Sequence, residues 1–176
     1  LTLEEQQENE EEIWNLLEQA VRGACIKFVE TREQEGENLK RDLLLKLDEM
    51  LSLVAVVEER SPEIVQEYRQ KLEQKVRELL SDSQMDEGRI ATEVTIFADK
   101  ICVDEETVRL KSHIEAMKTA LIAGGSIGRK LDFIAQEMNR EANTTLSKAN
   151  DLKLSDCAID LKTGIEKVRE QIQNLE

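Results

Sequence analysis

The sequence predicts an all-α protein, with a long antiparallel helical hairpin over residues 1–85 followed by a helical bundle domain over residues 86–176. The 176-residue chain has one proline, seven glycines and five aromatic residues, so it carries few signals for turns or strands. Apolar residues recur at spacings of three and four along most of the chain, as expected for amphipathic helices. Because 40% of the residues are hydrophobic, the chain can bury a core.

An apolar stripe begins near the amino terminus and predicts a first helix that runs to about Arg60. Its members are Ile13, Leu17, Ala20, Ala24, Phe28, Leu39, Leu43, Leu47, Met50, Val54 and Val57. Ser61 and Pro62 then match an N-cap residue and the first position of a helix, which predicts a tight turn. A return stripe follows at Ile64, Tyr68, Leu72, Val76 and Leu79. The polar run 81–88 is the predicted hinge between the two domains.

Further helices are predicted in the second domain. Asp104, Glu105 and Glu106 suit the first turn of a helix, because acids are favoured at its positive end. The double glycine at 124 and 125 predicts the end of that helix, and Ser126 is the predicted cap of the next one. A heptad seam closes the chain at Leu154, Ala158, Leu161, Ile165, Val168, Ile172 and Leu175. Its partner helix could belong to the same chain or to another subunit.

The net charge of −14 argues against sequence-independent nucleic-acid binding through the general surface, so we expect any such ligand to bind locally. The longest uncharged apolar run, LSLVAVV, is too short to cross a membrane. Cys25, Cys102 and Cys157 lack metal-type pairing, which predicts reduced core cysteines in a cytoplasmic protein. Because the chain begins at Leu1 without an initiator Met, we expect an upstream portion.

The stretch from Gly124 to Asp151 is the part that most needs a functional explanation. On a helical wheel its apolar face is Leu131, Ile134, Ala135, Met138 and Ala142. A second face carries Asp132, Gln136, Asn139 and Asn143 beside Arg129 and Arg140, and a third carries Glu137, Glu141 and Lys130. Residues 129–153 hold five Lys or Arg against four Asp or Glu, so a phosphate is better tolerated here than elsewhere. The alternative is a surface helix, or a buried polar network that fixes helix register.

Glu106, Arg109 and His113 lie along one edge of the preceding helix. They form either an ordinary salt-bridged edge or a carboxylate and imidazole presented as metal ligands or as an acid–base pair. GGSIGRK at 124–130 fails the spacing of a nucleotide-binding P-loop, and no strand is predicted before it. Metal-assisted hydrolysis is the catalytic class that these residues best permit.

Several runs carry a family resemblance: REQEGENLKRDL, EERSPEIVQEYRQKLEQKV, ADKICVDEETVRLKSHIE, GRKLDFIAQEMNREANT and EKVREQIQNLE. From about Thr31 onward the chain resembles the YicC-type (YloC) bacterial endoribonucleases. The resemblance implies a stress-associated protein that cleaves single-stranded RNA with a divalent metal, assembled as a hexamer, with an amino-terminal domain before Leu1. The chain departs from the family pattern at Leu146, where the family usually has Gly, and in the loop 149–156.

These observations together predict a metal-dependent endoribonuclease, or alternatively a non-catalytic helical adaptor that regulates RNA turnover. The predicted catalytic residues are Glu106, His113, Asp132, Glu137 and Glu141. The predicted ligands of Mn or Mg are Glu105, Glu106, His113, Glu137 and Glu141. The predicted RNA-binding residues are Arg129, Lys130, Gln136, Asn139, Arg140, Asn143 and Lys148. The expected partners are single-stranded RNA and further copies of the chain, with neither DNA nor a membrane.

Overall fold

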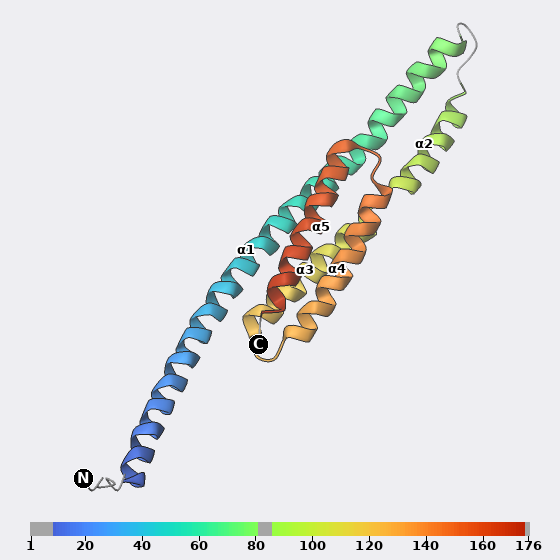
Figure 1. The fold of residues 1–176 in the computed structure, drawn as a ribbon. Helices are drawn as coiled ribbons and strands as arrows, with labels where there is room; N and C mark the ends of the chain where they lie inside the picture. Colours follow the sequence, from blue (N-terminus) through green and yellow to red (C-terminus); the bar gives the residue numbers. More distant parts are fainter. Residues whose placement is uncertain (1–8, 81–85, 175–176) are drawn as a thin grey trace. The chain divides into compact units, whose positions relative to one another are not determined.

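The structure, a computed structural model, describes residues 9–80 and 86–174, and the regular elements in these ranges are helices (Figure 1). They are α1 (Glu10–Leu80), α2 (Glu87–Ile101), α3 (Asp104–Ala123), α4 (Gly128–Lys148) and α5 (Leu152–Ile172). The prediction of an all-α fold is confirmed. None of these helices has a stretch both long and apolar enough to cross a membrane.

The chain divides into two compact units, Leu1–Arg41 and Asp42–Glu176, whereas the sequence predicted a domain boundary at residues 85 and 86. In the first unit most large apolar side chains of α1 are exposed, with Ile13 at 48% and Phe28 at 66%. The others of this kind are Trp14, Leu16, Leu17, Val21, Ile26 and Val29. The described residues of this unit therefore leave one apolar segment, 13–29, uncovered.

The second unit has its core among α1, α3, α4 and α5, and α4 packs against both α3 and α5. The largest fully buried side chains are Leu43, Leu47, Met50, Val54, Val57, Leu110, Ile114, Met117, Leu131, Met138, Leu161 and Ile165. The predicted seam from Leu154 to Ile172 is buried, and the helix that covers it belongs to the same chain. Leu175 lies outside the described residues.

Within the second unit, a smaller apolar cluster joins α2 to α1 and α5. It contains Val57 and Ile64 of α1, Ile101 of α2, Val103 and Leu154. Beside it the rings of Tyr68 and Phe97 stack with centroids 3.8 Å apart and an interplanar angle of 11°. The carboxyl-terminal part of α1 therefore packs against α2.

The predicted turn at Ser61 and Pro62 is wrong, because α1 continues through both residues. Proline removes one backbone donor and usually breaks a helix interior. Here Val57 and Ile64, on either side of it, are both buried in the same cluster, so tertiary packing keeps the segment helical. Ser61 does not act as a cap, since its hydroxyl is buried without a hydrogen-bond partner among the described residues.

The double glycine ends α3 as predicted, with φ of 68° at Gly124 and 84° at Gly125. Such positive angles strain other residues, so glycine is required here. The predicted cap at Ser126 is wrong: α4 begins one residue later, with Ile127 as its N-cap residue and no side-chain cap. The reason is the glycine turn, in which the Ile127 amide donates to the Gly125 carbonyl at 2.9 Å.

All three cysteines are free in the structure. The expectation that they are core residues is wrong for Cys25 and Cys102, which are exposed. Only Cys157 contacts a described apolar cluster, where burial raises the pKa of its thiol. A raised pKa keeps this thiol protonated, which does not favour a nucleophilic role.

Candidate functional site

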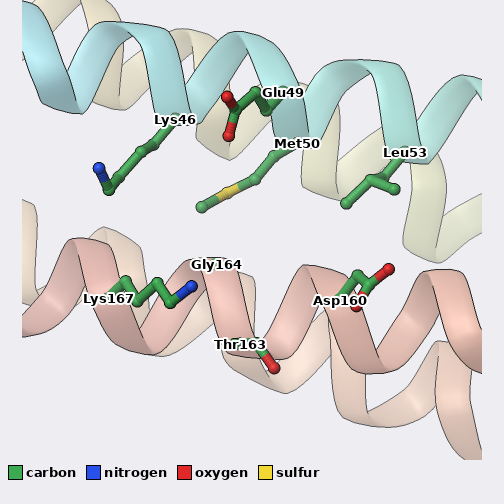
Figure 2. A pocket seen from close by; sticks show the side chains of 8 residues that line it. All are labelled: Lys46, Glu49, Met50, Leu53, Asp160, Thr163, Gly164 and Lys167. Carbon is green, nitrogen blue, oxygen red and sulfur yellow. The ribbon is translucent and has the colours of Figure 1, made fainter.

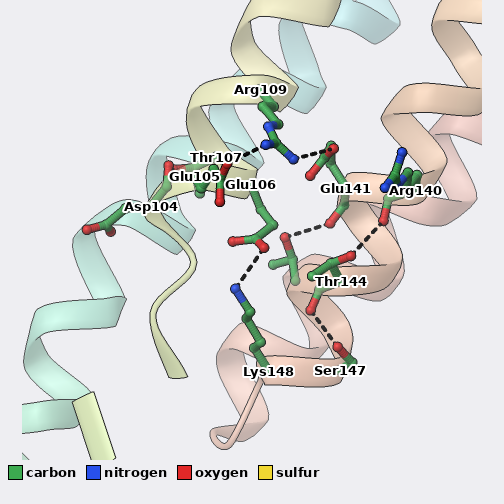
Figure 3. Close-up of polar contacts among 11 residues, drawn as sticks. Asp104, Glu105, Glu106, Thr107, Arg109, Arg140, Glu141, Thr144, Ser147 and Lys148 are labelled. Carbon is green, nitrogen blue, oxygen red and sulfur yellow. Dashed lines mark hydrogen bonds and ion pairs between the residues drawn. The ribbon is translucent and has the colours of Figure 1, made fainter. Parts of the chain in front are cut away.

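A cluster of five charged side chains lies between α3 and α4 (Figure 3). We call it the charge cluster; it consists of Glu105, Glu106, Arg109, Glu141 and Lys148. Glu106 is 5% exposed, and its Oε1 accepts a hydrogen bond from Lys148 Nζ at 2.7 Å. Glu141 is 4% exposed, and its Oε1 lies 3.5 Å from Arg109 Nη1. The other guanidinium nitrogen, Nη2, pairs with Glu105.

Helical spacing brings the cluster together. Glu105 and Arg109 are four residues apart on α3, and Glu141 and Lys148 are seven apart on α4, so each pair shares one face. Thr145 lies between the latter two and is fully buried, donating its hydroxyl to the Glu141 carbonyl at 2.9 Å. The two acids are therefore fixed in the seam between the helices, whereas Arg109 and Lys148 extend outward.

One oxygen in the cluster is unusual. Glu106 Oε2 is buried and has no hydrogen-bond partner among the described residues. A buried carboxylate oxygen without a partner is costly, and removal of a paired cation costs more. Glu106 therefore depends strongly on Lys148.

The described residues do not assemble the predicted metal site, because no three His, Cys, Asp or Glu side chains among them converge on one point. Glu106 and Glu141 face cations instead. Glu137 lies 4.0 Å from Arg140, and His113 is half-buried and forms no hydrogen bond with another described side chain. The acids among the described residues thus do not form a metal-ligand set.

The predicted polar face of α4 is partly used to attach α5. Asp132 accepts hydrogen bonds from Arg169 Nε at 3.1 Å and from Gln136 Nε2 at 2.7 Å. Asn139 Nδ2 donates to Glu166 at 3.2 Å. The contacts of Asp132 and Asn139 therefore support a role in a polar network between helices.

Other predicted RNA-binding side chains of α4 remain accessible. Arg129, Lys130 and Asn143 are exposed and pair with no described residue. The Arg140 side chain is 72% exposed, with only the distant contact to Glu137. The structure thus leaves these donors and cations open to a ligand, whereas Lys148 belongs to the charge cluster.

Two residues of the candidate site, Arg109 and Phe133, were not predicted from the sequence. Arg109 looked like part of an ordinary salt-bridged edge, but it reaches Glu141, which is 32 residues away on α4. Phe133 lies between the polar and apolar positions of the motif and is 64% exposed. The sequence did offer one signal for it, because a residue four positions after Arg129 lies on the same face of a helix.

A pocket of about 330 Å³ lies elsewhere in the second unit, between α1 and α5 (Figure 2). It is lined by Lys46, Glu49, Met50, Leu53, Asp160, Thr163, Gly164 and Lys167. None of the predicted site residues lines it. The candidate site is therefore the charge cluster together with the open face of α4.

Comparison with known proteins matches two parts of the chain to the same family. Residues 57–176 match the family described as endoribonuclease YicC-like, C-terminal, and residues 1–41 match its N-terminal region. The expectation that this region lies wholly before Leu1 is thereby corrected, since 41 residues of the chain match it.

Two relatives are each named probable endoribonuclease YicC. The chain is 45% identical over 175 residues to the protein from Clostridioides difficile, covering 99% of this chain and 60% of that protein. It is 38% identical over 149 residues to the protein from Haemophilus influenzae, covering 85% and 51% respectively. The chain thus spans between half and two thirds of the length of these relatives, and it belongs to the YicC-like endoribonuclease family.

Proposed function

We propose that this chain carries the cleavage site of an endoribonuclease that hydrolyses phosphodiester bonds in single-stranded RNA. The observation that carries the proposal is the charge cluster, in which two nearly buried acids hold two accessible cations. The side chains of Arg109 and Lys148 are 49% and 31% exposed, so a phosphate could reach both. Cations positioned in advance can stabilise the charge that develops on a phosphoryl group.

The acids have different roles in this proposal. Glu106 and Glu141 are too buried to meet water, so they act as positioning residues for Lys148 and Arg109. Glu105, whose side chain is 69% exposed, is the acid with access to a water molecule. It would accept a proton from the water as the water oxygen bonds to phosphorus; the bond from phosphorus to the ribose oxygen breaks, and that oxygen takes up a proton from solvent.

We also propose that cleavage requires a divalent cation, Mn or Mg. The five side chains of the charge cluster carry three negative and two positive charges, so a bound phosphodiester increases an existing negative charge. An added cation would offset it. The remaining predicted catalytic residues, His113, Asp132 and Glu137, stay hypotheses that this geometry does not favour.

The open face of α4 is the proposed RNA-binding surface. Arg129, Lys130 and Arg140 would neutralise phosphates, and Asn143 would hydrogen-bond base or ribose edges. Single-stranded RNA fits this surface because its bases are free of pairing. We further propose that the protein acts as a homo-oligomer, with the hexamer expected from the family resemblance.

The deciding experiment compares cleavage of a labelled single-stranded RNA by the intact protein and by a Glu106→Gln/Lys148→Met double variant. The double change removes both charges together, so no buried charge is left unpaired. We expect cleavage to fall by about 100-fold or more, as for loss of a group that acts in the transition state. Melting temperature should change little.

Lys118→Met is the matched control, because Lys118 also forms an ion pair between helices, with Asp48 at 2.6 Å, away from the charge cluster. It should keep full activity. RNA left intact by the wild-type protein with Mn or Mg would refute the nuclease and favour the adaptor. Cleavage that persists in excess EDTA would refute the cation requirement alone.

A further inference from the structure

A row of exposed side chains runs along α4 and includes an aromatic ring. Arg129, Phe133, Gln136 and Arg140 are spaced by four, three and four residues, which places them on one helical face. All four are exposed, with Phe133 at 64%. We call this set the Phe133 row.

Phe133 is not a core residue of this fold. Its neighbours Leu131, Ile134 and Ala135 are buried at 0%, 7% and 0% exposure, so the helix already directs a complete apolar face inward. In the described part of the second unit the other aromatic side chains, Tyr68 and Phe97, are half-buried and stack on each other. Phe133 is thus the exposed aromatic ring of that unit.

A single exposed apolar side chain is ordinary, and the surroundings are what give this one meaning. Arg129 lies one turn before the ring and Arg140 two turns after it. The nearest acid in sequence, Asp132, is occupied by hydrogen bonds from Arg169 and Gln136. The ring therefore lies between two cations, beside one acid that is engaged and a second, Glu137, that lies 4.0 Å from Arg140.

We infer that Phe133 is a stacking platform for a base of single-stranded RNA, with Arg129 and Arg140 contacting the phosphates on either side. This inference rests on the proposed function and names how its substrate is held. Aromatic rings beside cations bind single strands because every base has a π-face and every linkage a charge. Arginine also packs well against rings and bases.

A second copy of the chain is the competing occupant, and the composition of the row argues against it. Protein interfaces bury contiguous apolar groups at their centre. Around Phe133 the accessible positions on α4 are Arg129, Lys130, Gln136, Glu137 and Arg140, which are polar or charged. One ring within a polar surface suits a nucleotide better than an apolar interface.

The test uses fluorescence anisotropy with the intact protein and two labelled probes, an oligoadenylate and an abasic strand of equal length and charge. Phe133→Ala should weaken oligoadenylate binding by between about 5-fold and 150-fold, the range for loss of one base–aromatic stack. Its affinity for the abasic strand should stay within about 2-fold of wild type, since no base is present to stack. Phe133→Trp should retain binding, and Ile122→Ala, a change at an equally exposed apolar residue, should have no effect.

Salt dependence separates the ring from its neighbours. Phe133→Ala should leave the slope of log affinity against log salt unchanged, whereas Arg129→Gln and Arg140→Gln should each flatten it. Equal affinity of Phe133→Ala and wild type for oligoadenylate, or an equal loss on the abasic strand, would overturn the inference while leaving the proposed nuclease intact. If light scattering gave Phe133→Ala a different mass from wild type, the inference would be overturned in favour of an interface between copies. A wild-type protein that binds neither probe would overturn the proposed function as well.

Discussion

Arg60 and Asp151, 91 residues apart in the sequence, form a two-pronged ion pair. Nε and Nη2 of the guanidinium donate to the two carboxylate oxygens at 3.2 and 3.0 Å. The same carboxylate accepts the backbone amide of Leu154 at 3.2 Å and so caps α5. The residue that caps α5 is therefore also one that attaches it to α1.

We predict that Asp151→Ala destabilises the protein more than Asp86→Ala. Both residues are N-cap residues whose side chains accept helical amides, and loss of such a cap typically costs about 1 kcal/mol. Asp151→Ala also removes the main partner of Arg60. Urea unfolding of the two variants measures the difference, and equal losses would show that the ion pair contributes nothing.

The same contacts predict a loss of stability in acid. Hydrogen bonds from Arg60 lower the pKa of Asp151 and the pKa of Glu67 below their ordinary values of 3.8 and 4.5. A lowered folded-state pKa stabilises the protein above the ordinary value, and the effect is lost as pH falls through the lowered one. Unfolding midpoints between pH 7 and pH 3 should therefore fall less steeply in Arg60→Gln than in wild type. If the midpoints of the two proteins fell equally with pH, the Arg60 hydrogen bonds would not be the cause of the acid sensitivity.

Gly164 predicts an asymmetry between two glycine substitutions. A Cβ at Gly164 would lie 3.1 Å from Met50 Cε, whereas nothing lies within 4 Å at Gly36, also in a helix. Helical Gly→Ala changes normally stabilise by roughly 0.5–1 kcal/mol. Gly36→Ala should raise the melting temperature, and Gly164→Ala should raise it less, because the Met50 methyl must move. A larger gain at Gly164 would contradict the close contact.

The exposed cations at the start of α4 predict a specific effect on RNA affinity. Arg129→Gln and Lys130→Gln should each weaken binding of single-stranded RNA and reduce the log–log salt slope by about 0.7 for each lost phosphate contact. Helicity should not change, since both side chains are exposed and unpaired among the described residues. Titrations at several salt concentrations measure the slope. Unchanged slopes would leave α4 without a role in phosphate binding.

The uncovered apolar segment 13–29 predicts self-association, because a large exposed apolar surface is usually buried in an assembly. Light scattering of the 20.1 kDa chain should give a multiple of that mass at micromolar concentration. Leu17→Glu should lower the mass, since it places a charge in the segment. A monomeric mass for the wild-type chain would contradict the prediction.

Sequence periodicity predicted α4 and α5 well because the described positions of their predicted apolar stripes are buried by the neighbouring helices of the same unit. It failed at Pro62, where the contacts of Val57 and Ile64 override a local signal for a turn. It failed at Ser126 by one residue, because the glycine turn uses Ile127 to begin α4. Local rules were decisive only where tertiary contacts agreed with them.

The candidate site was harder to predict for a geometric reason. A helical wheel shows which residues share a face but not which face meets which helix. The pairing of Glu106 with Lys148 joins positions 42 residues apart, and that of Arg109 with Glu141 joins positions 32 apart. Glu141 was therefore predicted from the sequence as a catalytic residue and metal ligand, and only the packing of α3 on α4 shows that it is buried beside Arg109.

The unpartnered oxygen of Glu106 has a consequence for laboratory evolution of this protein. Buried ion pairs are often less stabilising than apolar side chains of similar volume, so Glu106→Leu combined with Lys148→Met is a route to a more heat-resistant fold. If the charge cluster performs the chemistry, selection for thermal resistance alone will favour these two substitutions. The selected proteins would then be stable but inactive. Libraries selected for activity at each round would instead keep both charges and gain their stability elsewhere.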